Sequence, residues 1–395
     1  MPPSAASSLS IAFVATCPPR QCGIATFSKD LARALQAADP SVKIQWAAIN
    51  EATSIHPYGP EVRWRIRQGL PDSYRAAAAA LNASDVDVVS LQHEFGLYGV
   101  WGDPFQDHLV SFLETLRKPL VTTLHSVLPQ PSASVLAAVR RIAQRSHEVV
   151  VMADRARSLL IDDYGVSPRS ITVIPHGVPP VEPHGRTRLK EQLDLTGRTI
   201  ITTFGLVDPR KGLEYMIEAM LTVRQYDPAA LYLVVGKTHP DLVRREGEIY
   251  RHQLWQLVQE LGLQEQVDFV DAYLRQAQIV DYLLASDIYV TPYLDPQQIT
   301  SGTLAYALGA GKAIVSTPYP HAVEVLSSER GILVPFRDQE QLAAAAVRIL
   351  SDVDLKQRLE RNAYTYGRET AWPRVGERVL SLLSAAAAAA LVSSA

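Results

Sequence analysis

The chain has 395 residues, of which 47% are apolar and 20% are charged, and its formal net charge is −3. These ordinary globular values exclude a disordered or fibrous chain, and the near-neutral balance gives no reason to expect nucleic acid or an anionic membrane as a partner. The length exceeds what one compact core usually holds, so it predicts two domains.

Cysteine usage and the chain ends bear on the cellular compartment. Cys17 and Cys22 share one short loop, which is too few for a disulfide framework and lacks the partners of a zinc site. We therefore expect a reduced, cytoplasmic protein. Residues 1–16 fit a first buried strand better than a signal peptide, and no stretch reaches the roughly eighteen uninterrupted apolar residues of a membrane helix. The alanine-rich tail Ala385–Ala390 is expected to fray.

In the first half of the chain, strand-like runs alternate with helix-like segments, the first of which is a helix predicted over Ser28–Gln36. The strand-like runs are Ser10–Thr16, Val86–Leu91, Pro119–Leu124, Val149–Met152 and Ile171–Ile174. Four of them end in loops that carry polar residues or glycine. Ligands of a doubly wound parallel sheet bind beyond the carboxyl ends of its strands, so this pattern predicts a domain that carries a site.

The proline- and glycine-rich stretch Gly177–Gly185 is typical of a connector, and the alternating pattern restarts after it. A helix is predicted over Leu213–Arg224. The predicted strands are Thr199–Phe204, Leu231–Val235, Val267–Val270, Ile288–Val290, Ala313–Ser316 and Gly331–Val334. Two successive α/β domains are the simplest account, and the cleft between such domains is the expected ligand site.

Two loops of the second half have the chemistry of an anion site. Gly205–Gly212 places Arg210 and Lys211 directly before a helix, where cations and free amides both suit a diphosphate. It is not a Walker loop, and a solvated turn is the alternative. In Thr291–Val315 the backbone around Ser301, Gly302 and Thr303 enters a helix whose first-turn amides point outward. The alternative there is a helix that is simply capped by its hydroxyl residues.

Polar residues also follow the strands of the first half. His93, Glu94 and His125 lie at strand ends, where a histidine hydrogen-bonds a sugar hydroxyl, acts as an acid or base, or fills a partly polar corner. A third ligand at metal-binding spacing is not evident. Gly23 precedes a helix and suits an approaching phosphate, but the spacing of a dinucleotide fingerprint is absent.

Taken together, the motifs resemble the retaining glycosyltransferases of family four, which have the GT-B fold. The order and spacing of the motifs make the match specific over nearly the whole chain. They are HEFG at His93–Gly96, TLH at Thr123–His125, VIPHGV at Val173–Val178, FGLVDPRKGLEYMIEAM at Phe204–Met220, then LYLVVG, SDIYVTPY, ALGAGKAIVST and AWPRV.

The resemblance implies two Rossmann-like α/β/α domains facing across a cleft. Residues 1–180 would bind the acceptor and would be joined by a crossover helix at about 372–390, and residues 181–371 would bind the nucleotide sugar. It also implies these roles: Lys211 holds the donor phosphates, with the amides of Ser301, Gly302 and Thr303; His125 contacts the donor sugar; His93 and Glu94 line the acceptor side. No metal or other cofactor is implied.

Three positions depart from the family pattern. Two glutamates spaced eight positions apart usually contact the donor sugar and the ribose, but here the positions hold Gln298 and Tyr306, which lack the bidentate grip of a carboxylate. The usual arginine of the phosphate loop falls on Leu206, which leaves Arg210 as a possible substitute.

The resemblance favours a hexosyltransferase that moves a hexose from a UDP-, GDP- or ADP-sugar to a sugar or small hydroxyl acceptor by front-face chemistry. The expected partners are the nucleotide sugar and the acceptor, without nucleic acid or stable membrane insertion. Because of the departures, a retaining phosphorylase that uses inorganic phosphate and a non-catalytic sugar-binding protein remain alternatives.

Overall fold

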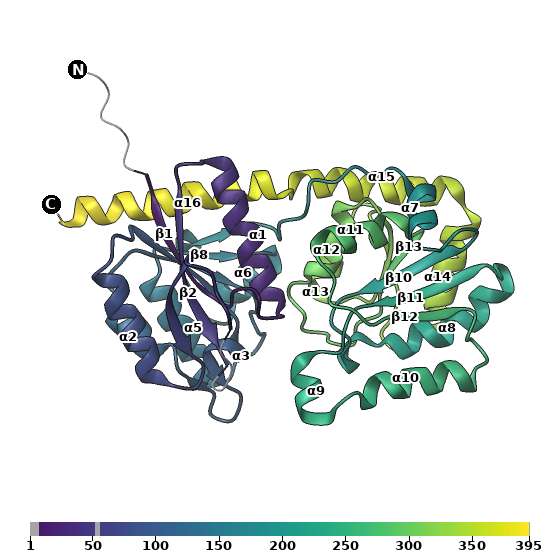
Figure 1. Ribbon diagram of the computed structural model, residues 1–395, viewed down its shortest axis with the longest axis horizontal. Helices are drawn as coiled ribbons and strands as arrows, with labels where there is room; N and C mark the ends of the chain where they lie inside the picture. Colours follow the sequence, from purple (N-terminus) through teal and green to yellow (C-terminus); the bar gives the residue numbers. More distant parts are fainter. Residues whose placement is uncertain (1–7, 52–55, 395) are drawn as a thin grey trace, which may run out of the picture. The chain divides into compact units, whose positions relative to one another are not determined.

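The computed structural model describes residues 8–51 and 56–394, and its contacts divide the chain into two compact α/β units (Figure 1). The first unit runs to Gly177 and takes up the C-terminal helix from Trp372, and the second runs from Val178 to Ala371. The first seven residues of the N-terminal stretch lie outside the described residues. Each unit has one parallel sheet between helices, as the sequence predicts.

The sheet of the first unit has the strand order β3-β2-β1-β4-β7-β8-β9, and neighbouring strands pair in parallel. Its strands are β1 (Ser10–Ala15), β2 (Lys43–Asn50), β3 (Val62–Arg67), β4 (Val88–His93), β7 (Leu120–Leu124), β8 (Glu148–Val151) and β9 (Ile171–Val173). A two-stranded antiparallel ribbon, β5 (Gly99–Val100) and β6 (Gln106–Asp107), follows β4. The central strands β1, β4 and β7 are buried along their whole length, since helices cover both faces of a parallel sheet.

The helices of the first unit lie on both faces of this sheet (Figure 1). They are α1 (Gly23–Ala38), α2 (Pro71–Asn82), α3 (Phe95–Tyr98), α4 (Val110–Thr115), α5 (Ala133–Arg145), α6 (Asp154–Asp162) and α16 (Trp372–Ser394), with a 3₁₀ turn at Pro168–Ser170. The first helix begins at Gly23, five positions before the predicted Ser28, because buried Ala25 and Phe27 already pack on the core.

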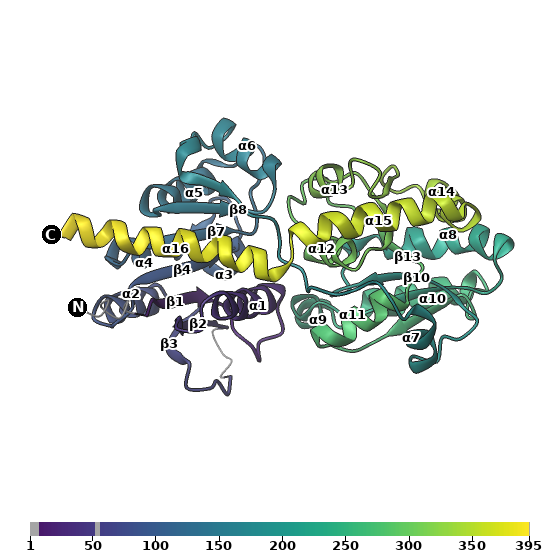
Figure 2. The ribbon, with the colours of Figure 1, turned by 90° about the horizontal axis from the view of Figure 1, so that it is seen from above.

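The C-terminal helix corrects one expectation. The tail does not fray, because α16 continues through Ala385–Ala390, with Leu383 and Ala386 buried in the same core as α1. Figure 2 shows α16 running beside α1. By length and composition alone, Trp372–Val392 is also apolar enough to cross a membrane, with 33% of the most apolar window buried in the unit.

The sheet of the second unit has the strand order β12-β11-β10-β13-β14-β15, again parallel throughout. Its strands are β10 (Thr199–Phe204), β11 (Ala230–Val235), β12 (Val267–Val270), β13 (Ile288–Thr291), β14 (Ala313–Ser316) and β15 (Ile332–Leu333). Successive strand residues point to opposite faces, so Ile201 and Val290 join one apolar core while Ile200 and Tyr289 join the other.

Helices cover both of these cores. They are α7 (Arg186–Gln192), α8 (Leu213–Tyr226), α9 (Pro240–Glu246), α10 (Ile249–Glu260), α11 (Gln276–Ala285), α12 (Gly302–Gly309), α13 (Pro320–Val325), α14 (Gln339–Ser351) and α15 (Val353–Glu369), with a 3₁₀ turn at Pro209–Lys211. One core takes side chains from α8, α10 and α14, and the other takes them from α12 and α13. The carboxyl ends of β10, β13 and β14 thus lead into three neighbouring loops, which form the site described next.

Candidate functional site

The loop between β10 and α8 is held in a sharply bent form by two glycines. Gly205 has φ +127° and Gly212 has φ +58°, conformations that side chains with a Cβ rarely adopt. A Cβ at Gly212 would lie 2.3 Å from the carbonyl oxygen of Pro292, which belongs to the loop after β13. In addition, the Leu294 amide donates to the Arg210 carbonyl oxygen at 2.8 Å. The two loops predicted to bind anions are therefore in direct contact.

The Lys211 ammonium group lies where these two loops meet. Its ammonium nitrogen lies 3.7 Å from the centre of the Tyr293 ring. Among the described residues, no carboxylate lies within ion-pair distance of this ammonium group. Burial, followed by repulsion from Arg210, lowers the pKa of Lys211 to about 7, while Asp208 acts in the opposite direction. A desolvated cation without a counter-ion is suited to an anionic ligand.

Arg210 behaves differently from its neighbour. Its guanidinium makes a two-point contact with the Asp208 carboxylate, at 2.9 Å from Nε and 3.1 Å from Nη2. Burial of Asp208 opposes ionisation, but its hydrogen bonds to Arg210 outweigh this effect and lower the pKa of the carboxyl group. The Arg210 side chain is 70% exposed. A ligand would have to compete with Asp208 for Arg210, so Lys211 is the stronger anion-binding candidate.

The first turn of α12 supplies neutral donors. Ser301 caps the helix, since its hydroxyl accepts from the Leu304 amide at 3.3 Å, and its own amide donates to Nδ1 of His321 at 3.0 Å. The amides of Gly302 and Thr303 are the next two along the chain, and no acceptor within the described residues is assigned to either. Of the three predicted phosphate-facing amides, Ser301 thus has a partner already, and Gly302 and Thr303 remain for a ligand.

Two of the three positions that depart from the family pattern also adjoin this turn. Gln298 donates through its side-chain amide to the Thr300 carbonyl oxygen at 3.2 Å. Tyr306 is 8% exposed, and its hydroxyl accepts from the Gln276 side chain at 2.8 Å. Tyr306 also packs against Phe204 at the end of β10, which makes it part of the core as well as of the site wall.

The predicted residues of the first unit cluster at the ends of β4 and β7. Glu94 accepts from the Ser126 hydroxyl at 2.6 Å, and the His125 amide donates to the His93 carbonyl oxygen. Nε2 of His125 lies 3.1 Å from Oε1 of Gln92, which favours the tautomer with the proton on Nε2 and leaves Nδ1 as an acceptor. Burial is the main cause that lowers the pKa of both His93 and His125 to about 3. Both rings are therefore neutral at pH 7.

The other predicted residue of this unit is Gly23, which starts α1. A Cβ there would meet nothing within 4 Å, so packing does not require glycine at this position. His93 itself is 1% exposed and stacks on Tyr98 at 5.4 Å, which fits a structural role at least as well as contact with an acceptor. Glu94 and His125 are only partly buried and are the better placed of the group to meet a ligand.

Sequence reasoning missed Tyr293 and assigned no role to His321. Tyr293 contacts Lys211, and His321 fixes the Ser301 amide. The first contact joins the segments after β10 and β13, and the second joins those after β13 and β14. The signal available in the sequence was only that each follows a predicted strand of the same sheet. Among the described residues, no group of three or more histidine, cysteine or acidic side chains could hold a metal ion.

Comparisons with known families agree with this geometry. The model described as Glycosyltransferase Family 4 matches residues 22–182, and the one described as Glycosyl transferases group 1 matches residues 198–352. Between them they span most of the chain. The chain belongs to glycosyltransferase family four. The predicted enzyme class is thereby confirmed as a glycosyltransferase, although neither match identifies the donor or the acceptor.

Among the curated relatives of this glycosyltransferase, a phosphatidyl-myo-inositol mannosyltransferase of Mycolicibacterium smegmatis is 26% identical over 82% of the chain and 77% of its own length. A D-inositol 3-phosphate glycosyltransferase of Geodermatophilus obscurus is 26% identical over 68% of the chain, and the match spans 62% of that relative. Similarity to these relatives is too low to transfer an acceptor.

Solved structures confirm the predicted GT-B fold. A sucrose-phosphate synthase of Thermosynechococcus elongatus superposes with a TM-score of 0.75 at 20% identity, over 96% of this chain and all of that one. Anabaena Alr3699/HepE, solved in complex with UDP and glucose, gives a TM-score of 0.73 at 17% identity, over 95% of this chain and all of that one. At these identities the likeness concerns the fold alone.

Proposed function

We propose that this glycosyltransferase moves a hexose from a UDP-, GDP- or ADP-sugar to a hydroxyl of a sugar or another small acceptor. Transfer would retain the anomeric configuration and would need no metal ion. The observation that carries the proposal is the Lys211 ammonium, which lacks a carboxylate partner among the described residues and lies in contact with the loop that leads to the α12 amides. A diphosphate satisfies both kinds of donor.

The names of similar proteins support a nucleotide hexose as the donor. One relative is called a mannosyltransferase, and one solved neighbour is described as a complex with UDP-glucose. In this chain Lys211 and the amides of Gly302 and Thr303 would hold the phosphates. Gln298 would contact the donor sugar and Tyr306 the ribose, each through fewer hydrogen bonds than a carboxylate makes.

The chemistry of the first unit suits uncharged sugar hydroxyls. Neutral His125 would accept a hydrogen bond from the donor sugar through Nδ1, and Glu94 would bind the acceptor. As the bond between the sugar and the leaving phosphate breaks, a phosphate oxygen would take the proton of the attacking acceptor hydroxyl. The protein would act by positioning both substrates and by stabilising the departing diphosphate through Lys211.

A panel of thermal unfolding measurements tests the donor assignment. We expect UDP, GDP or ADP to raise the melting temperature, because a ligand present at about a hundred times its Kd adds about 2.7 kcal/mol to the stability of the native state. Inorganic phosphate at the same concentration should have a much smaller effect. Stabilisation by phosphate without stabilisation by any nucleotide would contradict the proposal and favour a phosphorylase.

A further inference from the structure

Tyr293 lies between the two anion-binding loops, two residues after the end of β13. Its side chain is fully buried, and its ring stacks on that of Tyr319, with the ring centres 5.5 Å apart and the planes 16° apart. Its carbonyl oxygen accepts from the Thr317 hydroxyl at 2.6 Å. Contacts to the loop after β14 therefore hold both its ring and its backbone.

The ring face of Tyr293 is the partner of the Lys211 ammonium, at 3.7 Å from the ring centre. An aromatic face attracts a cation through its quadrupole, with a strength that grows when the cation is desolvated. A carboxylate in the same place would cancel the charge of the lysine and repel a phosphate. The ring instead holds the ammonium group without pairing its charge, so the charge stays available to a ligand.

The hydroxyl of Tyr293 points to the other half of the same site. It lies 2.6 Å from Oγ1 of Thr303, which in turn lies 3.1 Å from the hydroxyl of the cap residue Ser301. One side chain therefore contacts both the cation and the helix turn that would bind a diphosphate.

We propose that Tyr293 is a positioning residue of the phosphate site, whose ring holds the Lys211 ammonium beside the first turn of α12. This inference rests on the proposed function, since it assumes that Lys211 binds the diphosphate of the donor. The competing explanation is that Tyr293 only fills the core, as its complete burial also allows. The two explanations differ in whether the effect of Tyr293 on binding requires Lys211.

A double-mutant cycle separates them. The probe is whichever of UDP, GDP and ADP binds the wild type most tightly, and its Kd is measured by calorimetry. Tyr293→Met keeps an apolar side chain without a ring face, so we expect about a tenfold loss of affinity. Tyr293→Phe keeps the ring and should stay within about threefold of the wild type. In the Lys211→Ala background, Tyr293→Met should have no further effect.

The pH dependence of nucleotide affinity gives a second test, because a purely structural role of Tyr293 would not change it. Arg210 and Asp208 are the charged groups that act on Lys211, and all variants retain both of them. Ring contact favours the protonated lysine, so nucleotide binding by Tyr293→Met should fade at a lower pH on the alkaline side than binding by the wild type. Tyr293→Phe should keep the wild-type profile. Tyrosine ionisation does not interfere, because burial raises the pKa of Tyr293 to about 12.

Three results would overturn the inference. Additive losses in the cycle, or equal losses for Tyr293→Phe and Tyr293→Met, would show that the ring does not act through Lys211. If Tyr293→Met fails to fold, as melting curves would reveal, Tyr293→Leu takes its place in the cycle. If the wild type binds none of the three nucleotides, the proposed function fails and this inference fails with it. If the wild type binds a nucleotide but the losses in the cycle are additive, the role of Tyr293 is contradicted while the proposed function stands.

Discussion

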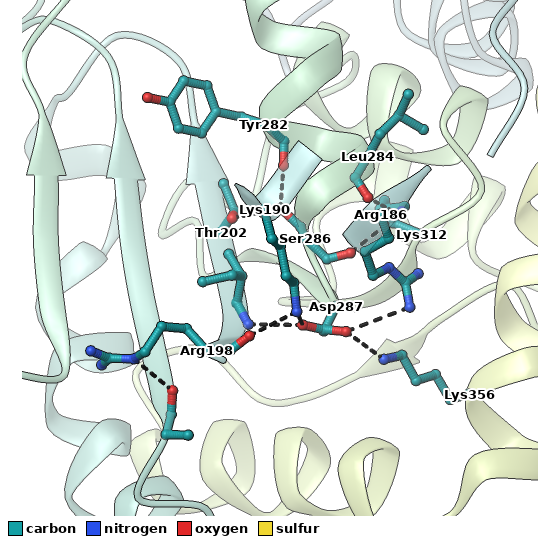
Figure 3. A network of polar contacts seen from close by, with 12 residues as sticks. Arg186, Lys190, Arg198, Thr202, Tyr282, Leu284, Ser286, Asp287, Lys312 and Lys356 are labelled. Atoms are coloured by element: carbon teal, nitrogen blue, oxygen red, sulfur yellow. Dashed lines mark hydrogen bonds and ion pairs between the residues drawn. The ribbon is translucent and has the colours of Figure 1, made fainter. Parts of the chain in front are cut away.

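Two charged groups, one at each end of the second unit's sheet, differ in whether they are paired with an opposite charge. At the amino end, Asp287 directly precedes β13, and its carboxylate lies 2.6 Å from Lys190, 2.9 Å from Lys356 and 3.5 Å from Arg186 (Figure 3). It also accepts from the Ile200 amide at the start of β10. At the carboxyl end, the Lys211 ammonium lies on an aromatic ring with no assigned carboxylate partner among the described residues.

This difference indicates that the Asp287 carboxylate stabilises the fold, whereas the Lys211 ammonium is available to bind a ligand. Asp287 is 7% exposed, and its contacts join α7, β10 and α15 to the start of β13. Matched charges of this kind leave nothing for a ligand to satisfy. Lys211 is partly buried and has no carboxylate partner among the described residues, which favours binding of an anion. The account therefore predicts that substitutions at one end change stability and those at the other end change affinity.

The largest effect should come from Asp287→Ala. Removing this carboxylate takes away the ion-pair partner of Lys190 and Lys356, while Arg186 keeps its contact with Glu360. Breaking a buried ion pair costs about 3–5 kcal/mol. Urea denaturation should show a loss of about 3 kcal/mol in the free energy of unfolding, with nucleotide affinity unchanged in the folded fraction. The matched control is Asp72→Ala, because the Asp72 side chain is 92% exposed in its ion pair and should leave stability nearly unchanged. Equal losses for the two variants would remove the contrast.

Lys312 should give a smaller, pH-dependent effect. It is 1% exposed, and its ammonium meets only the carbonyl oxygens of Ser286 at 3.2 Å and Leu284 at 3.4 Å among the described residues (Figure 3). Burial is the main cause that lowers the pKa of Lys312 to about 7, below the ordinary lysine value near 10.5. Between those two values the unfolded chain binds more protons than the native one, so the contribution of Lys312 to stability rises with pH.

The measurement is the free energy of unfolding of the wild type and of Lys312→Met at pH 7.5 and 8.5. Over this interval the wild type should gain about 1 kcal/mol relative to the variant. A difference between the two proteins that stays constant with pH would show that the lysine keeps its ordinary titration in the fold.

Arg210→Ala should have a still smaller effect on binding. Because Arg210 is already paired with Asp208 and largely exposed, we expect nucleotide Kd to rise by less than about threefold. Calorimetric titration measures this directly. A loss as large as that of Lys211→Ala would show that ligand binding breaks the contact with Asp208 and that Arg210 replaces the missing arginine at Leu206.

The smallest expected change concerns His125, at the uncharged end of the first unit. Burial and two neighbouring histidines place its pKa at about 3, so it should show no titration between pH 5 and 8. The ring-proton NMR signal that disappears in His125→Gln should therefore keep its chemical shift over this range. A midpoint near pH 6.5 would mean that the ring is open to water and is able to act as an acid or base.

Much of this contrast could be predicted from the sequence, because it depends on local patterns. The strand at Thr199–Phe204 was predicted with its observed bounds, and the loops before α8 and α12 were identified from their glycines and polar residues. By contrast, β2 and β3 were both missed, and β3 shows the reason most clearly. It is an edge strand in which exposed arginines alternate with less exposed residues, and it lacks the continuous apolar run that marks a buried parallel strand.

The remainder depended on contacts between distant segments. The pairing of Asp287 with Lys190 and Lys356 joins residues 97 and 69 positions apart, and no local period reports such a contact. In the sequence, Tyr293 is one aromatic residue after a predicted strand, and only the structure shows its contact with Lys211. The fold and the site loops therefore follow from sequence pattern, whereas the partner of each charge requires the tertiary structure.

Calorimetric titration of a nucleoside diphosphate into the wild type and Lys211→Ala shows whether Lys211 binds the donor phosphates. We expect Lys211→Ala to weaken binding of UDP, GDP or ADP by about 10–100-fold, as for the loss of a charge-assisted hydrogen bond of about 1.5–3 kcal/mol. Its free energy of unfolding should be nearly unchanged, since the ammonium is partly buried and makes no ion pair with a carboxylate of the described residues. Equal affinity in the two proteins would contradict the assignment of Lys211 to the donor phosphates.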